Sequence, residues 1–216
     1  MPDSTAAAAA RGTSYYSNER SDVVAALPRP VGRVLDVGCG AGAVAPGLRL
    51  AGAREIVGIE VEPAPAELAR QVLDEVVVAP VESALEELDG HFDTILCLDV
   101  LEHLVDPRSV LERLRAVAAR DAHLQVSVPN ARHYSLVRDL VLRGTFGYAE
   151  WGHRDSTHLR WFTRRDVVEL VGAAGWRVTG TSVPPLGRSA AIHRLTRGWS
   201  SEFLVAQVYV SATNPG

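Results

Sequence analysis

Lysine is absent from this chain of 216 residues, so all 22 of its basic residues are arginine. With 26 acidic residues the formal net charge is -4, which offers no general attraction to nucleic acid or to anionic membranes. Two cysteines, Cys39 and Cys97, are too few for a disulfide framework, and we expect free thiols in a cytoplasmic protein. No apolar run approaches the roughly 20 residues of a membrane span. These absences argue against a disulfide-rich secreted module, a membrane protein and a general nucleic-acid binder.

The first residues are rich in alanine but lack the basic region with which a signal peptide begins. We therefore expect a disordered lead-in over residues 1–12. The remaining residues, 13–216, suffice for one sizeable α/β domain and are too few for two ordinary ones. Apolar residues make up 47% of the chain, enough to form a buried core.

Short apolar runs that end at glycine or proline alternate with amphipathic stretches along the chain. The expected strands are 34–37, 55–60, 76–78, 92–98, 123–128, 176–181 and 203–211. The first two expected helices are 43–50 and 66–73. A third follows Asp106 and carries an apolar stripe of Val110, Leu111, Leu114, Val117 and Ala118. A fourth begins at a cap formed by Thr163 and Asp166 and ends at Gly175. This alternation predicts an α/β fold with a Rossmann-like, doubly wound sheet that is mostly parallel.

One connection, residues 131–161, is much longer than the rest and is dense in polar and aromatic side chains. Long loops at the carboxyl ends of parallel strands are where substrate sites are built. We therefore predict a substrate-site insertion here, with a helix around residues 135–142 and acceptor contacts from Tyr134, Trp151 and His153.

The first expected strand leads directly into Gly38-Cys39-Gly40-Ala41-Gly42, a loop that lets a ligand lie against the main chain. Alone this signal is weak, since it also fits the fingerprint of an NAD enzyme. Asp36 favours a different ligand, because a carboxylate suits a cationic amine and is awkward beside a pyrophosphate. Glu60 ends the second strand, where a carboxylate can accept both hydroxyls of a ribose.

The stretch 34–42 is similar to motif I of class I S-adenosylmethionine-dependent methyltransferases, Ile59-Glu60 resembles their ribose-binding strand end, and 98–104 resembles the stretch after their fourth strand. The last two strands fit as well, because this family has seven strands with an antiparallel C-terminal strand. The resemblance implies S-adenosylmethionine as cofactor, with S-adenosylhomocysteine as product. The residues that it implies as contacts are Tyr16, Asp36, Gly38, Cys39, Gly40, Gly42, Glu60, Val61, Val81, Glu82, Leu98 and Asp99.

The chain departs from the family after the third strand, where an acid often meets the adenine amino group. Pro80 occupies that place here, so the adenine contact falls to the Val81 backbone or to Glu82. Tyr16 is included because N-terminal aromatic residues fold over the cofactor in similar enzymes. The alternative to a cofactor contact is that Tyr16 has only a packing role.

His158 is the first candidate for a general base, since imidazole titrates near neutrality, and Asp155 is near enough in sequence to orient it. The stretch 155–162 resembles an Asp-x-Thr-His-x-Arg-x-Phe pattern of bacterial methyltransferases near sugar and natural-product pathways. It implies a biosynthetic O-methyltransferase acting on a sugar or secondary metabolite. A structural His158 is the alternative. His103 is a second catalytic candidate. The alternative is that it only caps the helical region after the fourth strand.

Asp99, Glu102, His103 and His158 together resemble the metal site of small-RNA 2′-O-methyltransferases, so a divalent cation and an RNA acceptor are alternatives. We expect no metal, because Asp-x-x-Glu-His-Leu is common in methyltransferases without one. The acidic balance argues against RNA. A cofactor-binding protein without catalysis is a further alternative. A small-molecule acceptor is the expected partner, with no membrane, and a homodimer is left open.

Overall fold

The computed structural model describes residues 20–150, 152–182 and 201–216. The chain divides into two compact units. The first comprises residues 1–96, 113–124 and 216, and the second comprises residues 97–112 and 125–215. Strands β4 (Phe92–Leu98) and β5 (Ala118–Pro129) both begin in the first unit and end in the second. The predicted lead-in, residues 1–12, lies outside the described residues, and one domain over 13–216 stays a prediction.

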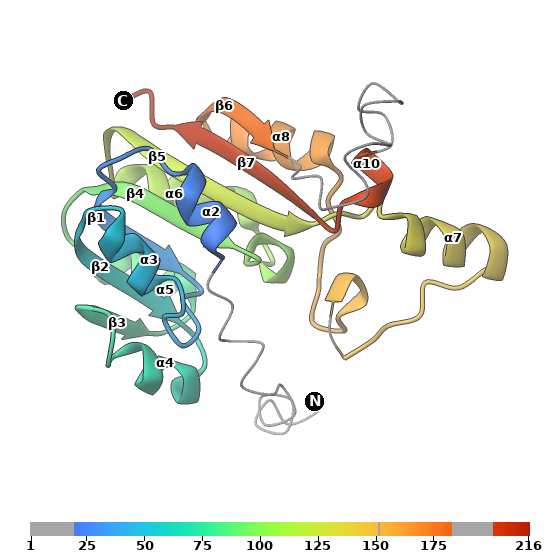
Figure 1. Ribbon diagram of the computed structural model, residues 1–216, viewed down its shortest axis with the longest axis horizontal. Coiled ribbons are helices and arrows are strands. Elements are labelled where there is room, and N and C mark those ends of the chain that lie inside the picture. The colour runs from blue at the N-terminus through green and yellow to red at the C-terminus, as the bar shows by residue number, and fades with distance from the viewer. Residues whose placement is uncertain (1–19, 151, 183–200) are drawn as a thin grey trace. The chain divides into compact units, whose positions relative to one another are not determined.

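Seven strands form one mixed sheet in the order β3-β2-β1-β4-β5-β7-β6 (Figure 1). Strands β1, β2 and β3 are parallel, whereas β6 and β7 pair antiparallel. The bounds of these five strands are Gly32–Val37, Ala53–Glu60, Glu75–Val78, Arg177–Ser182 and Gln207–Thr213. The predicted fold class, a mostly parallel Rossmann-like sheet with an antiparallel C-terminal strand, is confirmed.

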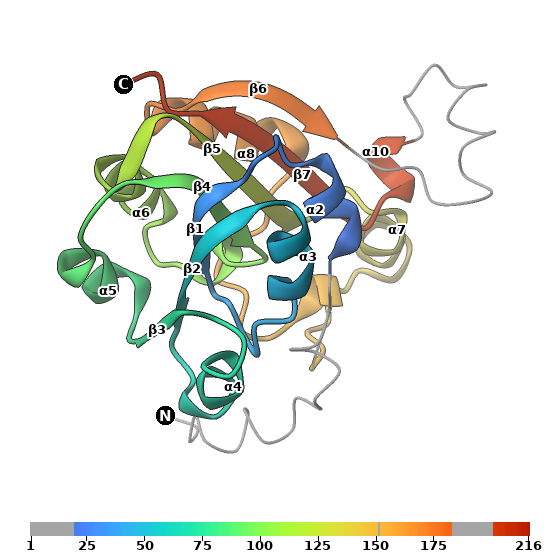
Figure 2. The same ribbon diagram turned by 60° about the vertical axis from the view of Figure 1, so that its left-hand side comes forward.

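The first unit contains the parallel strands β1 to β3. Apolar residues of β1 and β2 are buried, whereas the valines of the edge strand β3 are half-buried. Helix α3 contacts both β2 and α2, and Figure 2 shows the two helices next to each other. The helices of this unit are α2 (Ser21–Ala26), α3 (Ala45–Leu50), α4 (Pro63–Ala69) and α5 (Val81–Glu87). The strand register pairs Asp36 with Gly58 and Glu60 with Val78. Both acids therefore lie near the carboxyl ends of their strands.

The second unit holds the long connection and the C-terminal hairpin. Its helical elements, in chain order, are η1 (Leu101–His103), α6 (Pro107–Ala116, whose end belongs to the first unit), α7 (Tyr134–Arg143), η2 (Gly152–Arg154), α8 (Arg164–Ala173) and α10 (Ser201–Leu204). Helix α7 confirms the predicted helix around 135–142. The predicted caps are also present, because the Ser109 amide donates to Asp106 Oδ1 over 3.1 Å and Thr163 forms a capping box with Asp166.

Several element bounds differ from the predictions. Helix α4 begins at Pro63 and ends at Ala69, not over 66–73, because proline is favoured in a first helical turn. Val117 and Ala118 do not continue the stripe of α6, since the Val117 carbonyl accepts a hydrogen bond from the Phe92 amide over 2.8 Å and the chain is already extended there.

The last strand also begins later than predicted. Phe203 belongs to α10, and β7 begins at Gln207, because β6 ends at Ser182, which pairs with Tyr209. The sequence reading also missed α5, a helix of seven residues between β3 and β4. In the described part of the chain, no helix combines the length and apolar character that crossing a membrane requires.

Candidate functional site

The glycine loop after β1 adopts a backbone conformation that other residues rarely tolerate. Gly38, Gly40 and Gly42 have φ angles of 70°, 55° and 76°. The amides of Gly38 and Cys39 donate to the Ile59 carbonyl oxygen over 2.8 and 3.0 Å, so the loop is tied to the end of β2. The glycines are therefore required by the shape of the loop.

Glu60 connects the same loop to the chain that follows β2. Its Oε2 accepts a hydrogen bond from the Gly40 amide and its Oε1 accepts one from the Glu62 amide, both over 2.9 Å. Burial raises the pKa of the Glu60 carboxyl, and these amides, with that of Val61, oppose the rise. Each oxygen keeps a second lone pair, so the side chain can still accept the hydroxyl groups of a ribose.

Asp36 is 3% exposed at the end of β1. Burial raises the pKa of its carboxyl to about 7, the charge of Glu60 adds to this, and Arg20 opposes it. A buried carboxylate in such surroundings is stabilised by a cationic ligand. Together with Glu60, Asp36 therefore offers what a ligand with one cationic group and a ribose needs, which fits S-adenosylmethionine.

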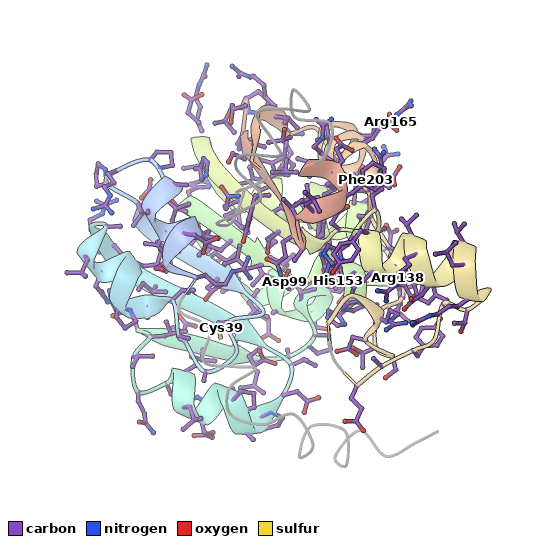
Figure 3. All side chains as sticks on the ribbon, turned by 45° about the vertical axis from the view of Figure 1, so that its right-hand side comes forward. Cys39, Asp99, Arg138, His153, Arg165 and Phe203 are labelled. Atoms are coloured by element: carbon purple, nitrogen blue, oxygen red, sulfur yellow. The ribbon has the colours of Figure 1, made fainter. Side chains whose placement is uncertain are left out.

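Cys39 contributes to this loop through its backbone and its bulk. Its side chain is buried, and burial raises the pKa of the thiol, so it is a poor nucleophile. A Cβ placed on Gly58 would lie 2.6 Å from Cys39 Sγ, which shows how closely the thiol packs on β2. Figure 3 labels Cys39 in this first unit.

The other predicted cofactor contacts lie in several places. In the first unit, Val61 is exposed, Val81 is buried at the start of α5, and Glu82 is half-buried in the same helical turn. Leu98 ends β4 in the second unit, and Tyr16 lies outside the described residues. The loop, Asp36 and Glu60 are thus the predicted cofactor residues that the first unit brings together.

Asp99 follows β4 and has a φ of 58°, unusual for a residue with a side chain. Its amide donates to the Ser127 carbonyl oxygen over 3.0 Å, and Ser127 Oγ donates to Asp99 Oδ1 over 3.1 Å. Gln207 Nε2 lies 3.0 and 2.9 Å from the two carboxylate oxygens. Gln207 was not predictable as a partner of Asp99, because it lies 108 positions further along the chain.

His103 and His158, the two predicted catalytic imidazoles, lie together in the second unit. Their ring centroids are 4.8 Å apart in an edge-on arrangement. His158 is 7% exposed. Burial and the neighbouring His103 lower the pKa of its imidazole, whereas Asp155, the His153 backbone and Asp99 raise it to a smaller extent. His158 is therefore a neutral imidazole at physiological pH, the form that accepts a proton.

Asp155 is buried and its carboxylate accepts from Thr157, whereas the bond with His158 is a backbone one, from the His158 amide to the Asp155 carbonyl oxygen over 3.1 Å. Asp155 Oδ1 accepts from the Thr157 amide over 2.8 Å and from the Thr157 hydroxyl over 2.7 Å. His103 Nδ1 lies 3.2 Å from that hydroxyl oxygen and 3.3 Å from the Thr157 carbonyl oxygen. The predicted orienting acid therefore reaches His103 through Thr157, a residue that the sequence reading missed.

Of the predicted acceptor contacts, Tyr134 is exposed at the start of α7, and Trp151 lies outside the described residues. His153 stacks on His133 with ring centroids 4.7 Å apart, and its Nε2 donates to the Ala206 carbonyl oxygen over 2.7 Å. Burial lowers the pKa of His153, although the nearby Asp99 raises it (Figure 3). Burial, with His153, lowers the pKa of His133 to about 4. The pair therefore presents two neutral stacked rings.

Residues 10–180 match the family model of the methyltransferase domain. The ubiquinone biosynthesis O-methyltransferase of Marinobacter nauticus is 31% identical over 182 residues, which cover 76% of this chain and 75% of that protein. The protein of the same name from Acinetobacter baylyi is 32% identical over 105 residues, 45% of this chain and 44% of that protein. The chain thus spans about half the length of several curated relatives that it matches.

Solved structures resemble the chain over almost its whole length. An S-adenosylmethionine-dependent methyltransferase from Mesorhizobium loti has a TM-score of 0.61 at 17% identity, covering 90% of this chain and 97% of that chain. A chain of the complex between the Haloferax volcanii Trm112 methyltransferase activator and the putative methyltransferase has a TM-score of 0.65 at 17% identity, covering 99% and 96%. At these identities the likeness shows the fold.

Proposed function

The chain belongs to the S-adenosylmethionine-dependent methyltransferases, and we propose that its acceptor is a hydroxyl group of a small molecule. The bound cofactor supplies a methyl group that its sulfonium makes electrophilic. The observation that carries the proposal is the buried neutral imidazole of His158, because a hydroxyl must lose its proton to become a strong nucleophile. The names of the curated relatives, O-methyltransferases of ubiquinone biosynthesis, support an oxygen acceptor.

In the first unit the proposed task is to hold the cofactor. Glu60 accepts the ribose hydroxyls, and the Asp36 carboxylate attracts the cationic part of the ligand. The loop of Gly38 to Gly42 lets the ligand lie against the main chain, with the Cys39 backbone as part of that surface. Val61, Val81 and Glu82 are the proposed contacts further along the ligand.

In the second unit the proposed task is to hold the acceptor and take its proton. His158 accepts the proton, His103 lies beside it, and Asp155 positions His103 through Thr157. Asp99 has a strained, hydrogen-bonded place after β4, which suits a residue that contacts the cofactor. Leu98, next to it, is proposed as a further contact.

The acceptor class is proposed from the residues of the long connection. The stacked rings of His133 and His153, with Tyr134 next in the chain, suit a ring-bearing acceptor such as a sugar or a secondary metabolite. These rings are neutral, so they favour an uncharged acceptor over a phosphate-bearing chain.

The test is methyl transfer from isotope-labelled S-adenosylmethionine to a panel of hydroxylated sugars and ring-bearing secondary metabolites. For the acceptor that is methylated, we expect His158→Gln to lower kcat by about 100-fold or more, the usual contribution of a general base. Affinity for S-adenosylhomocysteine is expected to stay unchanged, since His158 is not among the proposed cofactor contacts.

The matched control is His91→Gln, because His91 is exposed and outside the site. We expect it to keep the kcat of the unchanged protein. The proposal would be overturned by methyl transfer to no hydroxyl in the panel, or by a His158→Gln protein that keeps full kcat.

A further inference from the structure

Three side chains of the second unit bring metal-binding atoms close together. Within the described residues, one ligand atom each from Glu102, His103 and His158 lies within 4.8 Å of the others. With bonds of about 2.0–2.2 Å and tetrahedral angles at Zn²⁺, two ligand atoms on one ion lie roughly 3.4 Å apart. The longest separation in the cluster would therefore have to shorten by up to roughly 1.4 Å when an ion binds.

We propose that Glu102, His103 and His158 bind a divalent transition-metal cation of the Zn²⁺ type, which holds the acceptor hydroxyl. Two imidazoles and one carboxylate are a ligand set of catalytic zinc, which leaves a position open for substrate. A coordinated hydroxyl loses its proton more readily, because the cation stabilises the oxyanion. The role of the cation in holding the acceptor hydroxyl rests on the proposed function, whereas binding of the cation does not.

Backbone contacts hold the segment that carries His158 against η1, which carries the other two ligands. The amides of Leu159 and Arg160 both donate to the Glu102 carbonyl oxygen, over 2.8 and 3.1 Å. Arg160 Nε donates to the Leu104 carbonyl oxygen over 3.2 Å. The position of His158 relative to Glu102 and His103 is thus set by the main chain, as a preformed site requires.

His103 has the outer contacts that are typical of a metal-ligating histidine. A carbonyl oxygen can only accept, so His103 Nδ1 carries the proton that it shares with Thr157, and Nε2 is the ring nitrogen whose lone pair can bind a cation. The Thr157 hydroxyl donates to the buried Asp155 carboxylate, which completes a chain from carboxylate to hydroxyl to imidazole. Such outer contacts orient a ligand and increase its basicity.

His158 supplies the second imidazole from a buried position. Its Nδ1 has no hydrogen-bond partner within the part of the chain that the structure describes. A buried ring nitrogen without a partner is costly, and a bound ion would satisfy it. With the cation bound, His158 serves as a ligand in place of accepting the proton. The cation lowers the pKa of the coordinated hydroxyl, which releases its proton to solvent water.

The experiment is a titration of the chelator-treated, full-length protein with Co²⁺ alone, followed by visible absorption. We expect one equivalent to bind with the absorption bands of nitrogen and oxygen coordination, and Zn²⁺ to displace it. Glu102→Gln, His103→Gln and His158→Gln should each weaken binding by more than about 100-fold. Asp155→Asn keeps all three ligands and should weaken it by about 10- to 100-fold, the usual effect of an outer contact.

His91→Gln is the control and should leave the titration unchanged, since His91 is exposed and belongs to the other unit. Circular dichroism checks folding, and half-buried His103 is the safer variant should Glu102→Gln fail to fold. The proposal is overturned by the absence of Co²⁺ binding, or by binding that the three substitutions leave intact.

Methyl transfer measured on the same samples separates the two proposals. Full methyl transfer after chelation, together with the absence of cobalt binding, overturns the proposed cation site and supports His158 as the general base. Cobalt binding that the three substitutions abolish, with no hydroxyl acceptor methylated, supports the cation site and overturns the proposed function.

Discussion

Gly58, in the middle of β2, packs against the side of the glycine loop. A Cβ at this position would lie 2.6 Å from both Cys39 Sγ and Leu73 Cδ1, closer than real Cβ atoms approach other atoms. Both neighbours are buried, so the added methyl group has no free space to enter. The strand and the loop depend on each other at this residue.

We predict that Gly58→Ala lowers the free energy of unfolding by about 1–3 kcal/mol, because an added methyl overpacks the core. Gly172→Ala is the matched control, since Gly172 lies in α8 and has no atom within 4 Å of its added Cβ. Alanine favours helix, so this control should gain up to roughly 1 kcal/mol. Urea unfolding measures both changes, and equal stability of the two variants would contradict the prediction.

Single residues also show which site features a sequence can announce. Gly38, Gly40 and Gly42 were predictable because the loop needs a left-handed backbone at each of them. Thr157 was not, because its contact with His103 joins positions 54 residues apart. No local pattern encodes such a contact.

Helix α8 begins at a capping box that the sequence shows directly. The Thr163 hydroxyl accepts from the Asp166 amide, and Asp166 Oδ2 accepts from the Thr163 amide over 3.0 Å. These two bonds satisfy backbone groups that a helix otherwise leaves open at its start. The helix follows the residues that carry His158, so its start limits how far that segment can move.

We predict that Thr163→Ala lowers the free energy of unfolding by about 1 kcal/mol, the usual value of a lost N-cap. For a chain of this size the melting temperature should fall by roughly 2–4 °C. Thr163→Ser keeps the hydroxyl and should melt within about 1 °C of the unchanged protein, since the cap depends on that oxygen. Calorimetry gives both values, and an alanine variant that melts no earlier than the serine variant would show that the cap contributes nothing.

The sequence predicted the long connection 131–161 but not the ion pairs that join its parts. Its buried Asp139 lies 2.9 Å from Arg138, 3.1 Å from Arg143 and 3.2 Å from Arg154. The side-chain hydrogen bond from Arg138 contributes most to holding the Asp139 pKa below its usual range. Arg138 and Arg143 belong to α7 itself, whereas Arg154 comes from η2, so one carboxylate joins two parts of the segment.

At the scale of the whole molecule, Asp36 makes stability depend on pH. Its pKa is about 7 in the folded chain and near 3.8 when exposed, so the folded chain retains this proton over a range where the unfolded chain loses it. A raised pKa of this kind contributes stability that is complete below about pH 4 and is lost as the pH rises to 7 and above.

We therefore predict that the ligand-free protein gains stability when Asp36→Asn is introduced, and that the gain is larger at pH 8 than at pH 5. The neutral amide keeps the shape of the side chain and cannot ionise. Urea unfolding at the two pH values measures the difference. A gain that is the same at both values would show that Asp36 does not titrate in this range.

The sequence alone determined the fold class of this protein, because glycine positions, apolar periodicity and caps are local and each follows from backbone geometry. Its likeness to motif I of the methyltransferase family indicated the cofactor. It also marked His103, His158 and Asp155 as a group worth testing. Only the tertiary structure decided their partners. Asp155 is linked to His103 through Thr157, Gln207 contacts Asp99, and Glu102 lies in one cluster with the two imidazoles. These contacts join residues far apart along the chain, and only the folding of the chain brings them within bonding distance.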